Sequence, residues 1–299
     1  MKVISSAGFR WLVPVSAALA MAACGGGGGS GTGSLTVGVT DAPVDGAEAV
    51  VVAFTKVTVH KADGTTIEFP YDGEPIDLLQ FQDPVGEPRA VLVDSQSLEA
   101  GEYNWIRLDV EAVSGVRDSY ITIGGQEYDL RVPSGVLKLN RPFTVPQGGL
   151  LDITLDFDLR KSVTKPAGDY ILRPTVRIVD TAQTGTLSGT VDGTFLTGNC
   201  GGYTAGNVAV YVYEGEGVTP VEMDSVDPDP LVTAWVNDEG GIYSYRVPYL
   251  TAGTYTVALT CNANEDTPDA VEGTIVFVDT APSVAVTVDG GTQDFPTAP

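Results

Sequence analysis

The sequence contains one histidine and three cysteines among 299 residues, so the residue types behind much metal and nucleophile chemistry are scarce. One histidine excludes a histidine-rich zinc centre and leaves a Ser–His–Asp triad with a single candidate base, His60. The Gly-x-Ser-x-Gly motif of serine hydrolases and a glycine-rich phosphate loop are both absent. His60 stands near Lys56 on the polar side of a strand pattern, and we interpret it as a solvent-facing residue.

Basic residues are also few. The sequence has 16 lysines and arginines against 39 aspartates and glutamates, a net charge of −23. The first 23 residues contain Lys2 and Arg10 and no acidic residue, so the chain without them carries −25. Such a charge opposes binding to nucleic acid and adhesion to anionic lipid by charge alone. It favours solubility and a cationic partner or divalent cations.

The apolar stretch of residues 11–23 follows Lys2 and Arg10 and is too short to span a bilayer. This is the pattern of a secretory signal peptide, which we predict over residues 1–23. Its end, Met21-Ala22-Ala23-Cys24, resembles the bacterial lipobox, in which small residues precede a cysteine that is diacylated before cleavage. We therefore predict export and acylation of Cys24 with palmitate or a similar chain. An ordinary signal peptide with an incidental cysteine is the alternative.

A glycine- and serine-rich segment, residues 24–34, follows the signal and predicts a flexible tether. Two or three acyl chains, each contributing about 0.8 kcal/mol per buried methylene, would hold such a protein firmly on a membrane. Gly25, rather than an aspartate, follows the cysteine, which resembles the sorting pattern of outer-membrane lipoproteins in Gram-negative bacteria. The expected location is the outer membrane, with the folded part on its periplasmic or its surface face.

Two cysteines, Cys200 and Cys261, remain once Cys24 is acylated. An exported chain folds in an oxidising compartment, where an even pair of cysteines predicts a disulfide. Two free thiols are the alternative. No second cysteine or histidine lies near either residue in the sequence, which opposes a metal site.

From Leu35 onward, apolar and polar residues alternate in short runs broken by Gly, Pro, Asn and Asp, and no segment of a dozen residues has the helical period. We therefore predict an all-β fold with two tandem β-sandwich domains, residues 35–180 and 185–289, and a frayed tail over 290–299. Residues 98–103 and 250–255 share Leu, Ala, Gly and Tyr at matching positions. This repeat predicts a tyrosine corner in each half.

Residues 34–180 resemble the bacterial family DUF4382, a domain of unknown function found in lipoproteins. The residues that carry the resemblance are Gly38-Val39-Thr40-Asp41-Ala42-Pro43, residues 98–108, Leu155-Asp156-Phe157-Asp158 and Leu172-Arg173-Pro174. The resemblance implies a location in the cell envelope, and it implies no activity.

Residues 185–289 are similar to a carboxypeptidase-regulatory or transthyretin-like β-sandwich. The similarity is carried by Gly185-Thr186-Leu187-Ser188-Gly189-Thr190-Val191, Asn207-Val208-Ala209-Val210-Tyr211-Val212, Gly241-Ile242-Tyr243 and Ala252-Gly253-Thr254-Tyr255-Thr256-Val257. Domains of this type are usually accessory and some related sandwiches bind carbohydrate. The acidic segment 214–230 and the cysteine pair depart from the pattern.

Paired carboxylates are the main candidates for catalysis. Asp156 and Asp158 share one face of the alternating segment 151–159, as an acid–base pair of a hydrolase would. The alternative is that they are solvated or paired with arginine, and we expect Arg107 or Arg160 to supply that pairing.

A second set of candidates concerns binding. Asp224, Asp227 and Asp229 lie in one loop and form a candidate calcium site, although their spacing is not that of an EF-hand and a solvated acidic turn is the alternative. Trp235 and Tyr249 lie near this loop in the sequence and are candidate contacts for a sugar ring or a cationic surface. Trp105 alternates with Arg107 and Asp109, so we expect it to face outward; packing is the alternative for both tryptophans.

These observations favour a lipid-anchored cell-envelope protein with a non-catalytic binding or structural role, whose ligand is a protein or a glycan. A carbohydrate-binding module, with or without calcium, is the alternative. A carboxylate-dependent hydrolase is the third hypothesis.

Overall fold

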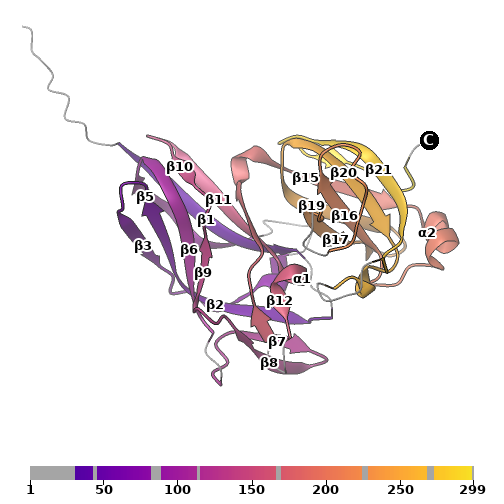
Figure 1. Cartoon of the computed structure of the whole chain (residues 1–299), viewed down its shortest axis with the longest axis horizontal. Helices are drawn as coiled ribbons and strands as arrows, with labels where there is room; N and C mark the ends of the chain where they lie inside the picture. Colours follow the sequence, from indigo (N-terminus) through magenta and orange to yellow (C-terminus); the bar gives the residue numbers. More distant parts are fainter. Residues whose placement is uncertain are drawn as a thin grey trace, which may run out of the picture.

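The computed structural model describes residues 31–42, 46–81, 89–112, 115–165, 170–223, 228–267 and 273–297. The predicted signal peptide and the predicted acylation site, Cys24, lie outside these residues. The fold is all-β, as predicted. Among the described strands, none of residues 32–180 pairs with one of residues 184–292, and we call these the N-terminal and C-terminal units (Figure 1).

The N-terminal unit contains a four-stranded sheet in the order β14-β11-β1-β5. Its central strand, β1, runs parallel to β11 and antiparallel to β5. The bounds are Thr32–Ala42 for β1, Ala90–Glu99 for β5, Leu150–Asp158 for β11 and Val176–Asp180 for β14. The alternating apolar side chains of these strands, such as Val37 and Leu155, are buried against the second sheet.

The second sheet of this unit has ten strands and is built around the long pair β2 and β6. Two hairpins, β2–β3 and β7–β8, turn at Asp63-Gly64 and Gly124-Gly125, residue pairs that favour tight turns. The bounds are Ala49–Lys61 (β2), Thr66–Pro70 (β3), Ile76–Asp77 (β4), Gly101–Glu111 (β6), Tyr120–Ile123 (β7), Gln126–Arg131 (β8), Val136–Leu139 (β9), Phe143–Val145 (β10), Val163–Thr164 (β12) and Tyr170–Leu172 (β13). A 3₁₀ turn, η1 (Leu78–Phe81), follows β4.

The C-terminal unit packs two four-stranded sheets, ordered β18-β19-β15-β22 and β17-β16-β20-β21. Their strands are β15 (Thr184–Val191), β16 (Ala209–Glu214), β17 (Val232–Trp235), β18 (Asn237–Asp238), β19 (Tyr243–Thr251), β20 (Gly253–Thr260), β21 (Phe277–Val286) and β22 (Gly291–Thr292). The helical elements are η2 (Thr181–Gln183), α2 (Gly193–Cys200) and η3 (Ala263–Glu265). Among the described residues, no helix is both long and apolar enough to cross a bilayer.

The repeated tyrosines form the same bond in both units. Tyr103 donates its hydroxyl hydrogen to the carbonyl of Glu99, and Tyr255 donates to the carbonyl of Thr251, in each case four residues upstream. Gly101 takes a φ of +136°, which only glycine adopts without strain, so this glycine serves the turn before Tyr103 as expected.

The predicted tether is shorter than expected, because its last residues belong to β1. Thr32, Gly33 and Ser34 pair with residues of β5. A side chain at Gly33 would lie 2.2 Å from the carbonyl of Pro146, so this glycine permits close packing of the chain. The Gly-Ser composition that predicts flexibility also suits a strand squeezed against its neighbours.

The prediction of a frayed tail from residue 290 is wrong for the described part of that segment. β22 pairs in parallel with β15, and the side chain of Phe295 is buried with 2% exposure. β15 accepts this segment because Gly185 and Gly189 have no side chains: a Cβ would lie within 1.8 Å of the carbonyls of Thr287 and Gln293, respectively. The closing strand depends on glycines about a hundred residues upstream, a pairing that local composition does not reveal.

Candidate functional site

The candidate carboxylates lie on β11, on the face of its sheet that does not point into the N-terminal core. Asp152, Thr154, Asp156 and Asp158 alternate with buried apolar residues, as the sequence predicts. They are not solvated, however: Asp156 and Asp158 are each only 6% exposed. This polar face is therefore an internal surface.

Each of these aspartates has a cationic neighbour. Arg89 makes a bidentate contact with Asp152, at 2.6 and 2.8 Å. Arg177 donates to Asp156 from the directly opposite position on β14. Lys161 Nζ lies 3.7 Å from Asp158 Oδ2.

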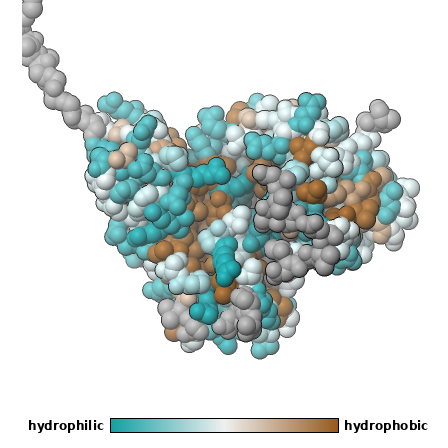
Figure 2. Space-filling model, in the orientation of Figure 1, coloured by the Kyte–Doolittle hydropathy of each residue, from teal (hydrophilic) through white to brown (hydrophobic). Residues whose placement is uncertain are grey.

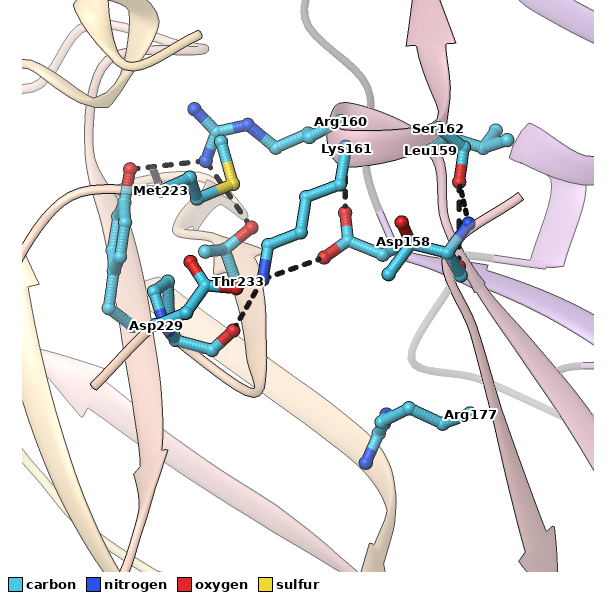
Figure 3. Close-up of polar contacts among 12 residues, drawn as sticks. Asp158, Leu159, Arg160, Lys161, Ser162, Arg177, Met223, Asp229 and Thr233 are labelled. Atoms are coloured by element: carbon cyan, nitrogen blue, oxygen red, sulfur yellow. Dashed lines mark hydrogen bonds and ion pairs between the residues drawn. The ribbon is translucent and has the colours of Figure 1, made fainter. Parts of the chain in front are cut away.

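The expected partners Arg107 and Arg160 are both engaged elsewhere, which corrects that prediction. Arg107 on β6 pairs with Asp109, 3.1 Å away. Arg160 is directed into the C-terminal unit (Figure 3). Arg177 was missed because its proximity to Asp156 comes from strand pairing across 21 residues of sequence.

A single helical turn, α1 (Leu159–Ser162), redirects the chain at the end of β11. Asp158 caps it by accepting a hydrogen bond from Lys161 N at 3.2 Å, and Asp41 accepts one from Leu159 N at 3.3 Å. The turn sends Leu159 into the N-terminal core while Arg160 and Lys161 reach the other unit (Figure 3). The local sequence thus places one apolar anchor and two cations on opposite sides of one turn.

The side chain of Arg160 inserts into the C-terminal unit, and the residue is 3% exposed. Its guanidinium donates four hydrogen bonds: to Tyr211 Oη (3.2 Å), Thr233 Oγ1 (3.3 Å), Ala263 O (2.7 Å) and Asp266 O (2.9 Å). The planar fork of an arginine suits such a set of fixed acceptors. Arg160 therefore bonds to two strands and to the η3 segment at once.

Two of the predicted binding residues belong to this junction. The guanidinium carbon of Arg160 lies 5.0 Å from the ring centre of Trp235, a cation–π distance. Lys161 Nζ donates to the carboxylate of Asp229 and to Pro230 O, the latter at 2.7 Å. The acidic and aromatic surface around these residues thus faces cations of the same chain, and we reassign Trp235 from a ligand platform to an interface residue.

Asp229 is a poor candidate for a calcium ligand, because its carboxylate already forms an ion pair with Lys161. Asp224 and Asp227 lie outside the described residues. Within the part of the chain that the structure describes, no group of three His, Cys, Asp or Glu residues is placed to hold a metal ion.

Burial sets the electrostatics of the junction. It raises the pKa of Asp156 and of Asp158 above the ordinary range, and the neighbouring Arg177 and Lys161 offset this only in part. Among the described residues, the buried Oδ2 of Asp158 has no hydrogen-bond donor. Burial likewise raises the pKa of Tyr211, whose hydroxyl donates to Asp266 Oδ2 at 2.7 Å.

The substitution Asp158→Asn preserves shape and removes this charge. An acid with a raised folded pKa stabilises the folded state fully below its unfolded pKa of about 3.9, and that stabilisation is lost as the pH rises through the folded pKa. We therefore expect the free energy of unfolding of the wild type to fall relative to the variant as the pH rises from about 4 towards neutrality. Urea denaturation at a series of pH values measures this difference. A change of the opposite sign would mean that the ion pair with Lys161 outweighs burial.

The predicted disulfide is present between Cys200 and Cys261, whose Cα atoms lie 5.4 Å apart. It ties the end of α2 to the residue that follows β20. This excludes both residues as free nucleophiles in the oxidised protein.

Tyr249, the other predicted binding residue, lines a groove of about 630 Å³ on the outer side of β15 and β19. Its neighbours there include Arg246, Ser188 and Asp289. The side chain of Tyr249 is 8% exposed, and its φ of +56° is unusual for a residue other than glycine. The groove is polar, and Tyr249 presents little of its surface to it.

Trp105 lies on the outer face of β6, as its alternation with Arg107 and Asp109 predicts. Its ring stacks on His60 of β2, with 4.7 Å between ring centres, and Lys138 Nζ of β9 lies 4.6 Å from it. β2 and β9 flank β6 on opposite sides, so the ring has neighbours on both. His60 is half-buried by this contact rather than fully solvent-facing.

A second cleft, of about 650 Å³, is formed by residues that the sequence analysis does not single out. It lies over the start of β2, where Val51 pairs with Tyr120 of β7 on one side and Asp77 of β4 on the other. Tyr71 and Phe81 border it from the segments that flank β4. We call it the Tyr71 cleft. Its aromatic residues are spread over 50 positions, so no local motif marks them.

The comparisons with known proteins bear on the N-terminal unit. Residues 32–174 match the family model described as "Domain of unknown function (DUF4382)". This confirms the resemblance seen in residues 34–180 over most of its length. No curated protein matches the chain in sequence.

Among solved structures, the TIE protein of Bacillus anthracis is 15% identical over 88% of this chain, with a TM-score of 0.18, and the chain spans about a third (32%) of its length. The CBM26-family module of Eubacterium rectale Amy13K, solved with maltoheptaose, is 11% identical over 89% of this chain and 98% of its own, with a TM-score of 0.18. The fimbrial anchor protein Mfa2 of Porphyromonas gingivalis is 13% identical over 83% and 82%, with a TM-score of 0.20. Such low TM-scores carry no argument about this chain.

Proposed function

We propose that the protein is a lipid-anchored component of the bacterial cell envelope with a non-catalytic binding or structural role. Acylation at Cys24 places it on the outer membrane, and the short glycine-rich segment before β1 separates the folded part from the lipid surface. The proposal rests on the lipobox-like sequence and on the match of residues 32–174 to a domain of unknown function.

The observation that carries the non-catalytic role is the state of the candidate carboxylates. Asp156 and Asp158 are buried beneath ion pairs with Arg177 and Lys161 at the contact between the two units. A general acid or base must reach its substrate, and a buried carboxylate that is paired with a cation of its own unit does not. These residues act as an interface instead.

The C-terminal unit is proposed to be an accessory sandwich of the carboxypeptidase-regulatory or transthyretin-like kind. Its two four-stranded sheets and its tyrosine corner at Tyr255 support this assignment. Arg160 and Lys161 fix it to the N-terminal unit, so the two units extend from the membrane as one arm. Figure 2 shows a notch between the upper ends of the two units.

The lipid anchor is tested by Cys24→Ser. Without the thiol there is no acyl acceptor, so we expect the variant to lose incorporation of labelled palmitate and to leave the membrane fraction. Metabolic labelling and fractionation of cells measure both effects, and Cys200→Ser serves as a control that keeps the lipidation site. Unchanged labelling of Cys24→Ser would contradict the anchor.

A further inference from the structure

We infer that the Tyr71 cleft binds a neutral saccharide. This inference rests on the binding role proposed above and gives it a ligand class and a location. The cleft lies in the N-terminal unit, away from the ion pairs of the junction. Its volume of about 650 Å³ lies within the range of small-molecule sites in proteins.

Apolar and aromatic residues form one part of the lining of the cleft, and polar or charged residues form the rest. Ala49 and Val51 of β2 form part of the floor, and Tyr120 stands beside Val51 because the two residues pair directly across the strands. Tyr71 and Phe81 stand over this floor from the flanking segments, and all three aromatic side chains are half-buried. A half-buried ring with one side towards a cleft offers a face for the C–H groups of a sugar ring.

The rim supplies both kinds of hydrogen-bonding group. Among the described residues, the carboxylates of Glu74 and Asp118 have no hydrogen-bond or ion-pair partner, so their acceptor oxygens are available. Gln80 and Arg117 line the cleft beside them. Arg117 Nη1 already donates to Glu127 at 3.0 Å and Gln80 Nε2 to Asp77 at 3.5 Å, so it is their other N–H groups that can donate to a ligand. The cleft thus offers apolar faces surrounded by hydrogen-bond acceptors and donors. A matching ligand carries C–H groups on its faces and hydroxyl groups at its edge, as a pyranose does.

Gly73 makes room for the ring of Tyr71 at the edge of the cleft. A Cβ at this position would lie 2.3 Å from the ring of Tyr71, so the tyrosine keeps its place because residue 73 lacks a side chain. Burial, and to a smaller extent the nearby Glu74 carboxylate, raises the pKa of Tyr71 above its ordinary value. Gly73→Ala is therefore a way to displace the ring without removing it.

Binding is tested with the full chain and neutral oligosaccharides of glucose, mannose, galactose and N-acetylglucosamine, by saturation-transfer NMR and calorimetry. We expect at least one to bind, and Tyr71→Ala, Tyr120→Ala and Gly73→Ala each to weaken it about tenfold or more. Thermal unfolding of each variant shows whether the fold is retained. Trp105→Ala, which removes a half-buried aromatic side chain from the outer face of β6, is the matched control and should leave the affinity unchanged.

A cationic ligand is the competing occupant, and an oligolysine peptide serves as its probe. Glu74→Gln and Asp118→Asn keep hydrogen-bonding groups and remove charge, so saccharide affinity should change only a few-fold, whereas a lysine peptide would lose most of its binding. Three results overturn the inference: no saccharide binds, the cleft holds the peptide instead, or Trp105→Ala abolishes saccharide binding while Tyr71→Ala does not. A saccharide that binds and is then cleaved would contradict the non-catalytic role while leaving the site in place.

Discussion

Replacing Arg160 with alanine should lower the free energy of unfolding by about 3–5 kcal/mol, because it removes the charged partner from a buried polar cluster. The carbonyls of Ala263 and Asp266 and the hydroxyl of Thr233 each lose a charge-assisted donor in a site with almost no access to water. Such unpaired acceptors cost more than the original bonds contribute. The guanidinium also leaves a gap beside the ring of Trp235.

In this variant the two units should separate from each other before either unit unfolds. Inter-unit interfaces that are polar permit relative motion unless specific contacts hold them, and Arg160 supplies four of those contacts. We therefore expect small-angle scattering to show a more extended particle, and hydrogen exchange to rise in η3.

Arg173→Ala is the matched control for this prediction. Arg173 is exposed and follows β13 on the same unit, so its loss should change stability by less than about 0.5 kcal/mol. Chemical denaturation of both variants measures the difference. Equal stability of Arg160→Ala and the wild type would contradict the role of Arg160 in holding the two units together.

The strands and hairpins follow from the sequence because their signals are local. Alternation in residues 151–158 predicts β11, and Asp63-Gly64 predicts the turn between β2 and β3. The Leu-x-Ala-Gly-x-Tyr repeat predicts both tyrosine corners, since the hydroxyl bonds to a carbonyl only four residues away. In each case the residues that specify the feature lie within one turn or one strand.

The functional assignments were less predictable because they depend on contacts between distant segments. The sequence places an acidic and aromatic region around Trp235, which suits either a sugar ring or a cationic surface. The cationic surface is Arg160 and Lys161, supplied by a four-residue turn some 70 positions upstream. The acidic and aromatic residues that would suit an external partner instead contact cations of the same chain. Only the packing of the two units distinguishes these two cases.

The closing segment shows the same dependence on tertiary structure. Gly, Pro and Thr in residues 290–297 have no periodic pattern, yet Phe295 enters the core and its backbone N–H donates to Thr190 O at 2.8 Å. β15 can take up this segment because Gly185 and Gly189 have no side chains that would block it. The effect of these glycines becomes visible only when the other segment packs against them.

Loss of the Cys200–Cys261 bond should have an effect of similar size to that of Arg160→Ala. The bond closes a loop with a sequence separation of 61 residues. In the chain-entropy model, opening a loop of this length costs about 4 kcal/mol, because the unfolded chain regains the freedom that the bond removed. The double variant Cys200→Ser/Cys261→Ser should therefore unfold at lower denaturant concentration by that amount.

The reductant provides the internal control for this prediction. Wild-type protein treated with dithiothreitol should become as unstable as the double variant, while the double variant should not respond to it. The bond lies in the C-terminal unit, so hydrogen exchange should increase in α2 and the end of β20 and should stay unchanged in β2 and β6. A double variant with wild-type stability, or exchange that rises equally in both units, would contradict a local stabilising role for this disulfide.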